Sequence, residues 1–213
     1  MPSCPAGCPG QPRARTEPAV ERSRKIFVVH GRNAAARFAI FAFLRSIGLA
    51  PIEWSQAIAA TGKASPYIGE VIDAALASAQ AVVVLWTPDE IVSLLPEYAD
   101  GDDDPDVRPS FQARPNVMFE AGLAIGRAPD RVVLVELGRV RDFSDVIGRN
   151  TVRLSNTVAS RQELAIRLRT AGCAVDLSGT DWHTTGDFTS PPQPRLYAID
   201  LNERRWAPPY DRS

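Results

Sequence analysis

Glu120 is a carboxylate inside an otherwise apolar helical pattern that runs from Val117 to Leu123. A carboxylate is costly to bury unless it is paired or has a task, so this position is a candidate for catalysis. Asn116 precedes it by four residues and shares its helix face. Two structural readings stay open: an ion pair with Arg127 or Arg32, or an ordinary helix surface position. No second carboxylate has a matching helical placement, so a two-carboxylate sugar hydrolase is not indicated.

A second candidate group follows an apolar run near the start of the chain and consists of His30, Gly31, Arg32 and Asn33. Polar side chains with a glycine, placed just before a helix N-terminus, suit a phosphate or a ribose. The structural alternative is a turn followed by a helix N-cap at Asn33. Both readings place this group at the beginning of a helix.

Trp54, Gly62 and Lys63 lie after the next apolar segment and are also candidates for substrate binding. Trp54 either stacks on a base or packs in the core. The segment around Lys63 is not a Walker A loop, because Ala57 stands where the first glycine is needed and Ala64 follows the lysine.

Thr87 follows the most hydrophobic run and is the remaining candidate at a strand end. A phospho-acceptor receiver domain needs acidic residues after the first and third strands, where this chain has His30 and the pair Trp86–Thr87. A Rossmann dinucleotide site is unsupported as well, because no G-x-G-x-x-G follows the first strand.

Apolar runs alternate with helical patterns through the body of the chain. The runs predict strands at 26–29, 50–53, 81–85, 131–136 and 151–154. Helices are expected from Asn33 to Gly48, from Ser65–Pro66 onward, from Thr87–Pro88 towards Leu95, from Pro115 to about Gly126, and from a capping box at 160–163 to Gly172. The first helix is expected to bury Phe38, Phe41, Leu44 and Ile47.

Two segments between these elements read as loops. Residues 55–65 are small and polar, and a second loop of about fifteen residues contains the acidic run 101–106. The acidic run is expected to be solvated, because its aspartates lack the spacing of a calcium-binding loop.

Strand–helix alternation with short linkers predicts an α/β protein with parallel pairing and right-handed crossovers. Five such units form a flavodoxin-like three-layer sandwich with strand order 2-1-3-4-5. Ligands of such sheets bind outside the carboxyl ends of the strands, near the switch point between strands one and three. The candidate residues follow these strand ends.

Composition excludes several classes of protein. The chain has 213 residues, 45% hydrophobic, and a formal charge of -1, which gives no case for nucleic-acid binding or an anionic membrane surface. No apolar run is long enough for a spanning helix. Three cysteines and two histidines leave little for a disulfide framework or a zinc site, so no metal is expected.

Prolines divide the chain, since ten of the 18 lie in residues 1–20 and 190–213. Residues 1–24, with Cys4 and Cys8, are expected to be a disordered leader without signal-peptide character, and the protein is expected to be cytoplasmic. Residues 25–175 form the expected domain. Residues 176–213 form an extension whose aromatic residues indicate that it packs at least partly on the domain.

Six segments together resemble a bacterial TIR-like domain, and more narrowly the TIR effector modules of cyclic-nucleotide-triggered antiphage systems. They are KIFVVHGRN, GLAPIEW, TGKASPYIGEVIDAAL, AVVVLWTPDE, RPNVMFEAGLAIGR and RVVLVELG. No single segment is specific, but their order is. The resemblance covers about residues 25–175.

The resemblance implies an enzyme that cleaves the nicotinamide–ribose bond of NAD+, with NAD+ as substrate and no cofactor. Glu120 matches the catalytic glutamate of the family, and Asn116 occupies the position of its usual tryptophan. Gly62 and Lys63 correspond to the mobile BB loop. From their loop positions, His30, Arg32 and Lys63 are assigned to the pyrophosphate and Trp54 to stacking, while Gly31, Asn33 and Thr87 complete the expected site.

One carboxylate suffices for this chemistry, because nicotinamide already leaves well and the developing charge on the ribose needs stabilisation. Whether the product is linear or cyclic ADP-ribose stays open. The resemblance also implies self-association and an upstream sensor or second-messenger partner. The alternatives are a non-catalytic signalling scaffold and a nucleoside deoxyribosyltransferase, which would exchange bases on deoxynucleosides.

Overall fold

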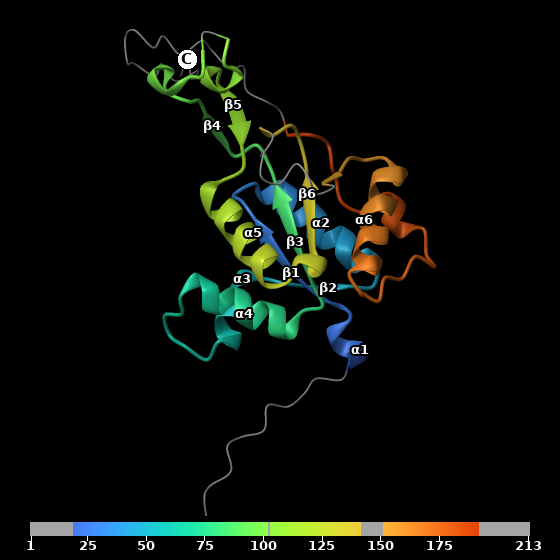
Figure 1. Ribbon diagram of the computed structural model, residues 1–213. Helices are drawn as coiled ribbons and strands as arrows, with labels where there is room; N and C mark the ends of the chain where they lie inside the picture. Colours follow the sequence, from blue (N-terminus) through green and yellow to red (C-terminus); the bar gives the residue numbers. More distant parts are fainter. Residues whose placement is uncertain (1–18, 102, 142–150, 192–213) are drawn as a thin grey trace, which may run out of the picture.

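The computed structural model of the protein describes residues 19–101, 103–141 and 151–191. Its central sheet consists, in spatial order, of β2 (Ala50–Ile52), β1 (Lys25–His30), β3 (Ala81–Trp86), β6 (Val132–Glu136) and β7 (Val152–Arg153). All neighbouring strands of this five-stranded sheet are parallel. The predicted α/β class and the order 2-1-3-4-5 are confirmed (Figure 1).

Helices cover both faces of the sheet (Figure 1). One face carries α2 (Ala34–Ser46) and α6 (Val158–Thr170), and the other carries α3 (Trp54–Ala60), α4 (Ile68–Ser78) and α5 (Pro115–Arg127). The described residues also include short elements: α1 (Ala19–Arg22) and the 3-10 turns Pro96–Tyr98, Pro105–Val107, Pro129–Arg131 and Asp181–His183.

Burial along β1 shows why this strand lies inside the sheet and not at its edge. Ile26 and Val28 belong to the core under α2 and α6, whereas Phe27 and Val29 belong to the core under α4 and α5. Successive side chains of a strand point to opposite faces, so a strand with helices on both faces needs a continuous apolar run.

The expected short helix from Pro88 towards Leu95 is wrong. Residues Glu90–Val92 form β4, which pairs antiparallel with β5 (Ser110–Gln112) in a separate two-stranded sheet that projects beyond the central sheet (Figure 1). Ile91 lies opposite Phe111, which is buried. Because the partner strand is far along the chain, the local pattern alone could not reveal this pairing.

The expected loop at 55–65 is wrong in its first half, which is helix α3. This helix begins with a capping box, in which Gln56 accepts a hydrogen bond from the backbone N–H of Glu53 at 2.8 Å. The following helix starts at Ile68, two residues after the proline that was expected to open it.

Two details of the outer helices also differ from expectation. Phe38 is 64% exposed, although Phe41, Leu44 and Ile47 of the same predicted face are buried. Helix α6 is capped by Thr157, whose hydroxyl accepts from the Ser160 backbone N–H. The N-cap at Asn33 is as predicted, with its side-chain oxygen accepting from Ala36 at 3.0 Å.

The segment after α6 shares the core of the domain. Trp182 and Phe188 are buried in the cluster that contains α2 and α6, and the rings of Phe188 and Phe43 meet edge to face with centroids 5.9 Å apart. Residues 176–191 therefore pack on the body. At the other end, Arg22 of α1 donates to the carbonyl of Leu76 at the end of α4.

Cys4, Cys8 and the aromatic residues of the tail beyond 191 lie outside the described residues, so their predicted roles remain predictions. Within the described part of the chain, no helix has both the length and the apolar character required to cross a membrane.

Candidate functional site

A pocket of about 450 Å³ opens at the carboxyl ends of β1 and β3, where the direction of strand order changes. This is the place where open parallel sheets bind ligands. Its lining comes from the β1–α2 turn, the start of β4 and the start of α5: Arg32, Asn33, Pro88, Asp89, Glu90 and Arg114. Two of these, Arg32 and Asn33, are among the residues predicted from sequence.

Asp89 ties the two strand ends together. Its carboxylate accepts from the Arg32 backbone N–H at 3.2 Å and from the Thr87 hydroxyl at 2.9 Å. Thr87 is itself buried. The predicted residue Thr87 therefore orients Asp89, and Asp89 in turn fixes the turn that carries Arg32.

Gly31 allows this close approach, because a Cβ atom at that position would lie 1.6 Å from the Asp89 Oδ2 atom. We expect Gly31→Ala to push the carboxylate off both donors and to lower the free energy of unfolding by about 1–2 kcal/mol. Urea denaturation of the variant and the wild type measures this difference.

The control is the same substitution in an Asp89→Ala background, where the clash is absent and the cost should largely vanish. Gly122→Ala is a second control, because a Cβ there meets nothing within 4 Å and an alanine favours the helix. If Gly31→Ala lowered the free energy of unfolding equally in the Asp89→Ala background, the clash with the Asp89 carboxylate would not be the reason for the glycine.

Arg114 and Arg32 provide the positive charge of the pocket. Arg114 is the N-cap residue of α5, and its Nε lies 3.2 Å from a Glu90 carboxylate oxygen. Arg32 is exposed at the pocket. Two carboxylates, Asp89 and Glu90, line the same opening, so Arg114 can bind a pyrophosphate together with Arg32 only when the ligand displaces Glu90. In the described residues, no group of three or more His, Cys, Asp or Glu side chains is arranged to hold a metal ion.

Glu120 lies in the second turn of α5, half-buried beside the apolar face formed by Val117, Ala121 and Ala124, which packs on the sheet. Burial raises the pKa of Glu120 to about 7, and the nearby Arg114 guanidinium opposes part of that rise in pKa. The carboxylate is thus electrostatically coupled to a residue that lines the pocket.

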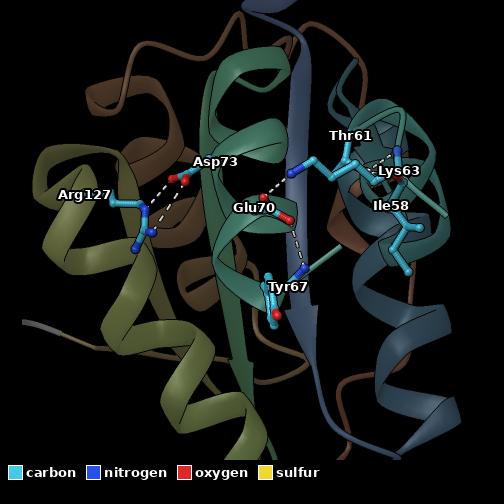
Figure 2. Close-up of polar contacts among 7 residues, drawn as sticks. All are labelled: Ile58, Thr61, Lys63, Tyr67, Glu70, Asp73 and Arg127. Atoms are coloured by element: carbon cyan, nitrogen blue, oxygen red, sulfur yellow. Dashed lines mark hydrogen bonds and ion pairs between the residues drawn. The ribbon is translucent and has the colours of Figure 1, made fainter. Parts of the chain in front are cut away.

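The ion-pair reading of Glu120 is not what the structure shows. Arg127 pairs with Asp73 of α4 (Figure 2), and Arg32 is held through its backbone by Asp89. Within residues 19–101, 103–141 and 151–191, no side chain forms an ion pair with Glu120. A half-buried carboxylate without a cationic partner costs stability, which favours a functional reason for its presence.

The raised pKa of Glu120 predicts a pH-dependent gain in stability for Glu120→Gln. The folded state holds the Glu120 proton more tightly than the unfolded state, so wild-type stability falls as pH rises from 4.5 to about 7. Glutamine removes this loss. We expect no difference between the two proteins below pH 4.5 and an advantage of about 2 kcal/mol for the variant above pH 7. Thermal unfolding at both pH values measures it; an advantage independent of pH would contradict the burial argument.

Four further predicted residues do not line the pocket: His30, Trp54, Asn116 and Glu120. His30 ends β1, and its Nδ1 lies 2.9 Å from the carbonyl of Gly31. Trp54 begins α3 and packs on Phe27 with ring centroids 5.7 Å apart, which favours its core reading. Asn116 is exposed in the first turn of α5. Contact of these residues with a substrate stays a prediction.

Gly62 and Lys63 are not brought to the pocket. Lys63 follows α3 and pairs with Glu70 at the start of α4 (Figure 2). The hydrogen bond from Lys63, together with one from the Tyr67 backbone N–H, holds the pKa of Glu70 below its usual value. The Lys63 ammonium is therefore bound to a carboxylate 7 residues further along the chain, rather than at the pocket.

Sequence reasoning missed the roles of Asp89, Glu90 and Arg114. Asp89 directly follows Pro88 after a buried strand, and Arg114 directly precedes Pro115 at a helix start, so strand-end and helix-start positions were the available signals. Their partners lie far along the chain and could not be read from spacing.

A parallel sheet in the order 2-1-3-4-5 with helices on both faces defines a flavodoxin-like α/β domain. The family model of the CAP12/Pycsar effector protein TIR domain matches residues 25–156. The chain belongs to this family, as the sequence resemblance predicted.

The chain is also similar to the Uncharacterized protein YuaY of Escherichia coli (strain K12). The two are 30% identical over 163 residues, which cover 75% of this chain and 50% of that protein. The chain therefore spans about half the length of this curated relative.

Proposed function

We propose that the protein is an NAD+ glycohydrolase with Glu120 as its catalytic carboxylate. The observation that supports this most directly is a half-buried, unpaired glutamate on α5 whose pKa is raised to about 7, coupled to the pocket through Arg114. A carboxylate with these properties is poised near neutral pH and has no structural partner among the described residues.

In the proposed reaction the bond between ribose C1′ and the nicotinamide nitrogen breaks, and both electrons leave with nicotinamide. The pyridinium charge makes nicotinamide a good leaving group without protonation. The ionised Glu120 stabilises the positive charge that develops on the ribose and holds its hydroxyls. Water then bonds to C1′ and loses a proton to solvent, which gives ADP-ribose; alternatively, a second nucleophile of the substrate bonds to C1′, and any proton it carries is lost to solvent as the cyclic product forms.

Arg32 and Arg114 are proposed to bind the pyrophosphate of NAD+, with Asn33 at the edge of the same pocket. The family membership supports a role as an effector, which we propose acts in antiphage defence or cell death downstream of a sensor or second messenger.

A signalling scaffold is the second candidate, and one observation favours it. The arm formed by β4, β5 and their connecting segment exposes Ile91, Leu95 and Tyr98. Exposed apolar groups on a projecting arm favour self-association, with or without catalysis.

Purified full-length protein, incubated with NAD+ over a range of protein concentrations, tests the proposal. Nicotinamide release and a product with the mass of ADP-ribose or its cyclic form are expected, with a steep dependence on protein concentration if assembly completes the site. Binding of NAD+ without turnover at any concentration would favour the scaffold, and base exchange on a deoxynucleoside would favour a deoxyribosyltransferase.

A further inference from the structure

Glu90 is the carboxylate of the pocket that can exchange its partner. The other acidic residue of the lining, Asp89, already uses both carboxylate oxygens, which accept from the Arg32 backbone N–H and the Thr87 hydroxyl. Glu90 instead faces Arg114, with one carboxylate oxygen 3.2 Å from the guanidinium Nε. The two side chains are 38% and 29% exposed, so a ligand in the pocket can reach both. Asp89 therefore shapes the pocket, whereas Glu90 is available to a ligand.

A ligand phosphate competes with Glu90 for Arg114, because phosphate and carboxylate oxygens accept the same charge-assisted hydrogen bonds from a guanidinium. The Arg32 guanidinium lies at the same opening and forms no ion pair with any residue that the structure describes. A single phosphate on Arg114 only replaces one anion by another. A pyrophosphate that also reaches Arg32 gains an additional ion pair, so the pocket favours diphosphate ligands.

Glu90 stays in the pocket after a ligand displaces it from Arg114. Its backbone is paired with Gln112 of β5, and the residue before it donates its N–H to the Gln112 carbonyl at 3.1 Å. A half-buried carboxylate without a donor is costly, so the displaced Glu90 needs a new hydrogen-bond donor. The groups next to the pyrophosphate of a dinucleotide are ribose hydroxyls, which acidic residues also bind in other α/β folds.

We propose that Glu90 accepts a hydrogen bond from the adenosine ribose, so that the pocket selects NAD+ over its 2′-phosphorylated form, NADP+. This inference rests on the proposed function, which assigns the pyrophosphate to Arg32 and Arg114 and the nicotinamide ribose to Glu120. The ribose that remains for Glu90 is the one that carries adenine. A 2′-phosphate cannot donate this hydrogen bond, and its negative charge meets that of Glu90. Like charges brought together in a half-buried site exclude a wrong ligand.

Calorimetric titration of the full-length protein with two uncleaved ligands tests the proposal. The ligands are ADP-ribose and ADP-ribose phosphorylated at the 2′ position of its adenosine, and the wild type is expected to bind the first about tenfold more tightly. Glu90→Gln keeps the shape of the side chain and removes its charge. This variant should bind both ligands with affinities within about threefold of each other. Glu90→Ser should give the same result, so a folding defect in one variant does not decide the test.

Glu97→Gln is the matched control, because this glutamate is exposed on the connecting segment of the same arm and does not line the pocket. It removes the same charge and should keep the preference of the wild type. A wild type without a preference for ADP-ribose, Glu90 variants that keep the preference, or its loss in Glu97→Gln would each overturn the proposal.

These titrations need no turnover, so their outcome is separate from that of the proposed reaction. A protein that prefers ADP-ribose through Glu90 but does not cleave NAD+ would contradict the catalytic role of Glu120 and support the role of Glu90. A protein that cleaves NAD+ while its Glu90 variants keep the wild-type preference would contradict the role of Glu90 alone.

Discussion

Glu120→Gln is expected to lower the rate of NAD+ cleavage by a factor of about a hundred to a thousand, while the fold is kept. Glutamine has nearly the same shape as glutamate and removes only the charge. It is also expected to stabilise the fold at neutral pH, so a loss of activity cannot be attributed to unfolding. Nicotinamide release at saturating NAD+ measures the effect.

Glu163→Gln is the matched control, because this glutamate is exposed on α6 and faces Arg167 at 3.7 Å on the other side of the sheet. It should cleave NAD+ at the wild-type rate. Equal turnover by the Glu120 and Glu163 variants would remove Glu120 from the mechanism.

The pH dependence of the wild-type rate gives the same carboxylate a second signature. Since the ionised form stabilises the ribose cation and burial raises the pKa of Glu120 to about 7, the rate should rise with pH up to about 7 and then level off. Below that value the rate should fall about tenfold per pH unit. The residual rate of Glu120→Gln should lack this acid limb.

The central sheet could be predicted from the sequence because its strands are continuous apolar runs. Ala81–Trp86 is buried along its whole length, and a run of that kind fits only a strand covered on both faces. Short linkers between strands and helices then restrict the order of the sheet. These signals are local, so a single sequence carries them.

The β4–β5 pair could not be predicted in the same way. Each strand has three residues, and Glu90 meets Gln112 across a long connection. Pro88 in the stretch before β4 resembles a helix start, since proline is common in the first turn of a helix. Pairing with the distant strand β5 determines that residues 90–92 form a strand and not a helix.

The candidate site also divides into features that the sequence predicts and features that depend on tertiary contacts. The positions of Glu120, Arg32 and Asn33 follow from strand ends and helix periodicity. The direction of a long flexible side chain does not, and Lys63 is drawn to Glu70 by a nearby opposite charge. Asp89 acquires its role only when β1 and β3 lie side by side and bring the Arg32 backbone N–H to it.

Arg161 explains why the segment after α6 stays on the body. It is a charged side chain that is only 1% exposed. Its guanidinium donates to the backbone carbonyls of Thr185 and Gly186 and to the Asn156 side-chain oxygen, and it stacks 4.6 Å from the Phe188 ring centroid. Desolvation lowers the pKa of Arg161, yet the arginine stays charged because its ordinary value is so high.

Arg161→Met is therefore expected to lower the free energy of unfolding by about 3 kcal/mol, or Tm by about 6–12 °C. Methionine fills much of the space but leaves the half-buried carbonyls of Thr185 and Gly186 without the Arg161 donor. The free energy of unfolding of Arg161→Lys should lie between those of the wild type and Arg161→Met, since an ammonium keeps the charge but cannot reach all three acceptors. Arg167→Met on the same helix, where the arginine is solvated, should cost under about 0.5 kcal/mol. Thermal unfolding of the wild type and the three variants measures these differences. Equal losses of stability in Arg161→Met and Arg167→Met would mean that the Arg161 guanidinium does not hold residues 185–188 in place.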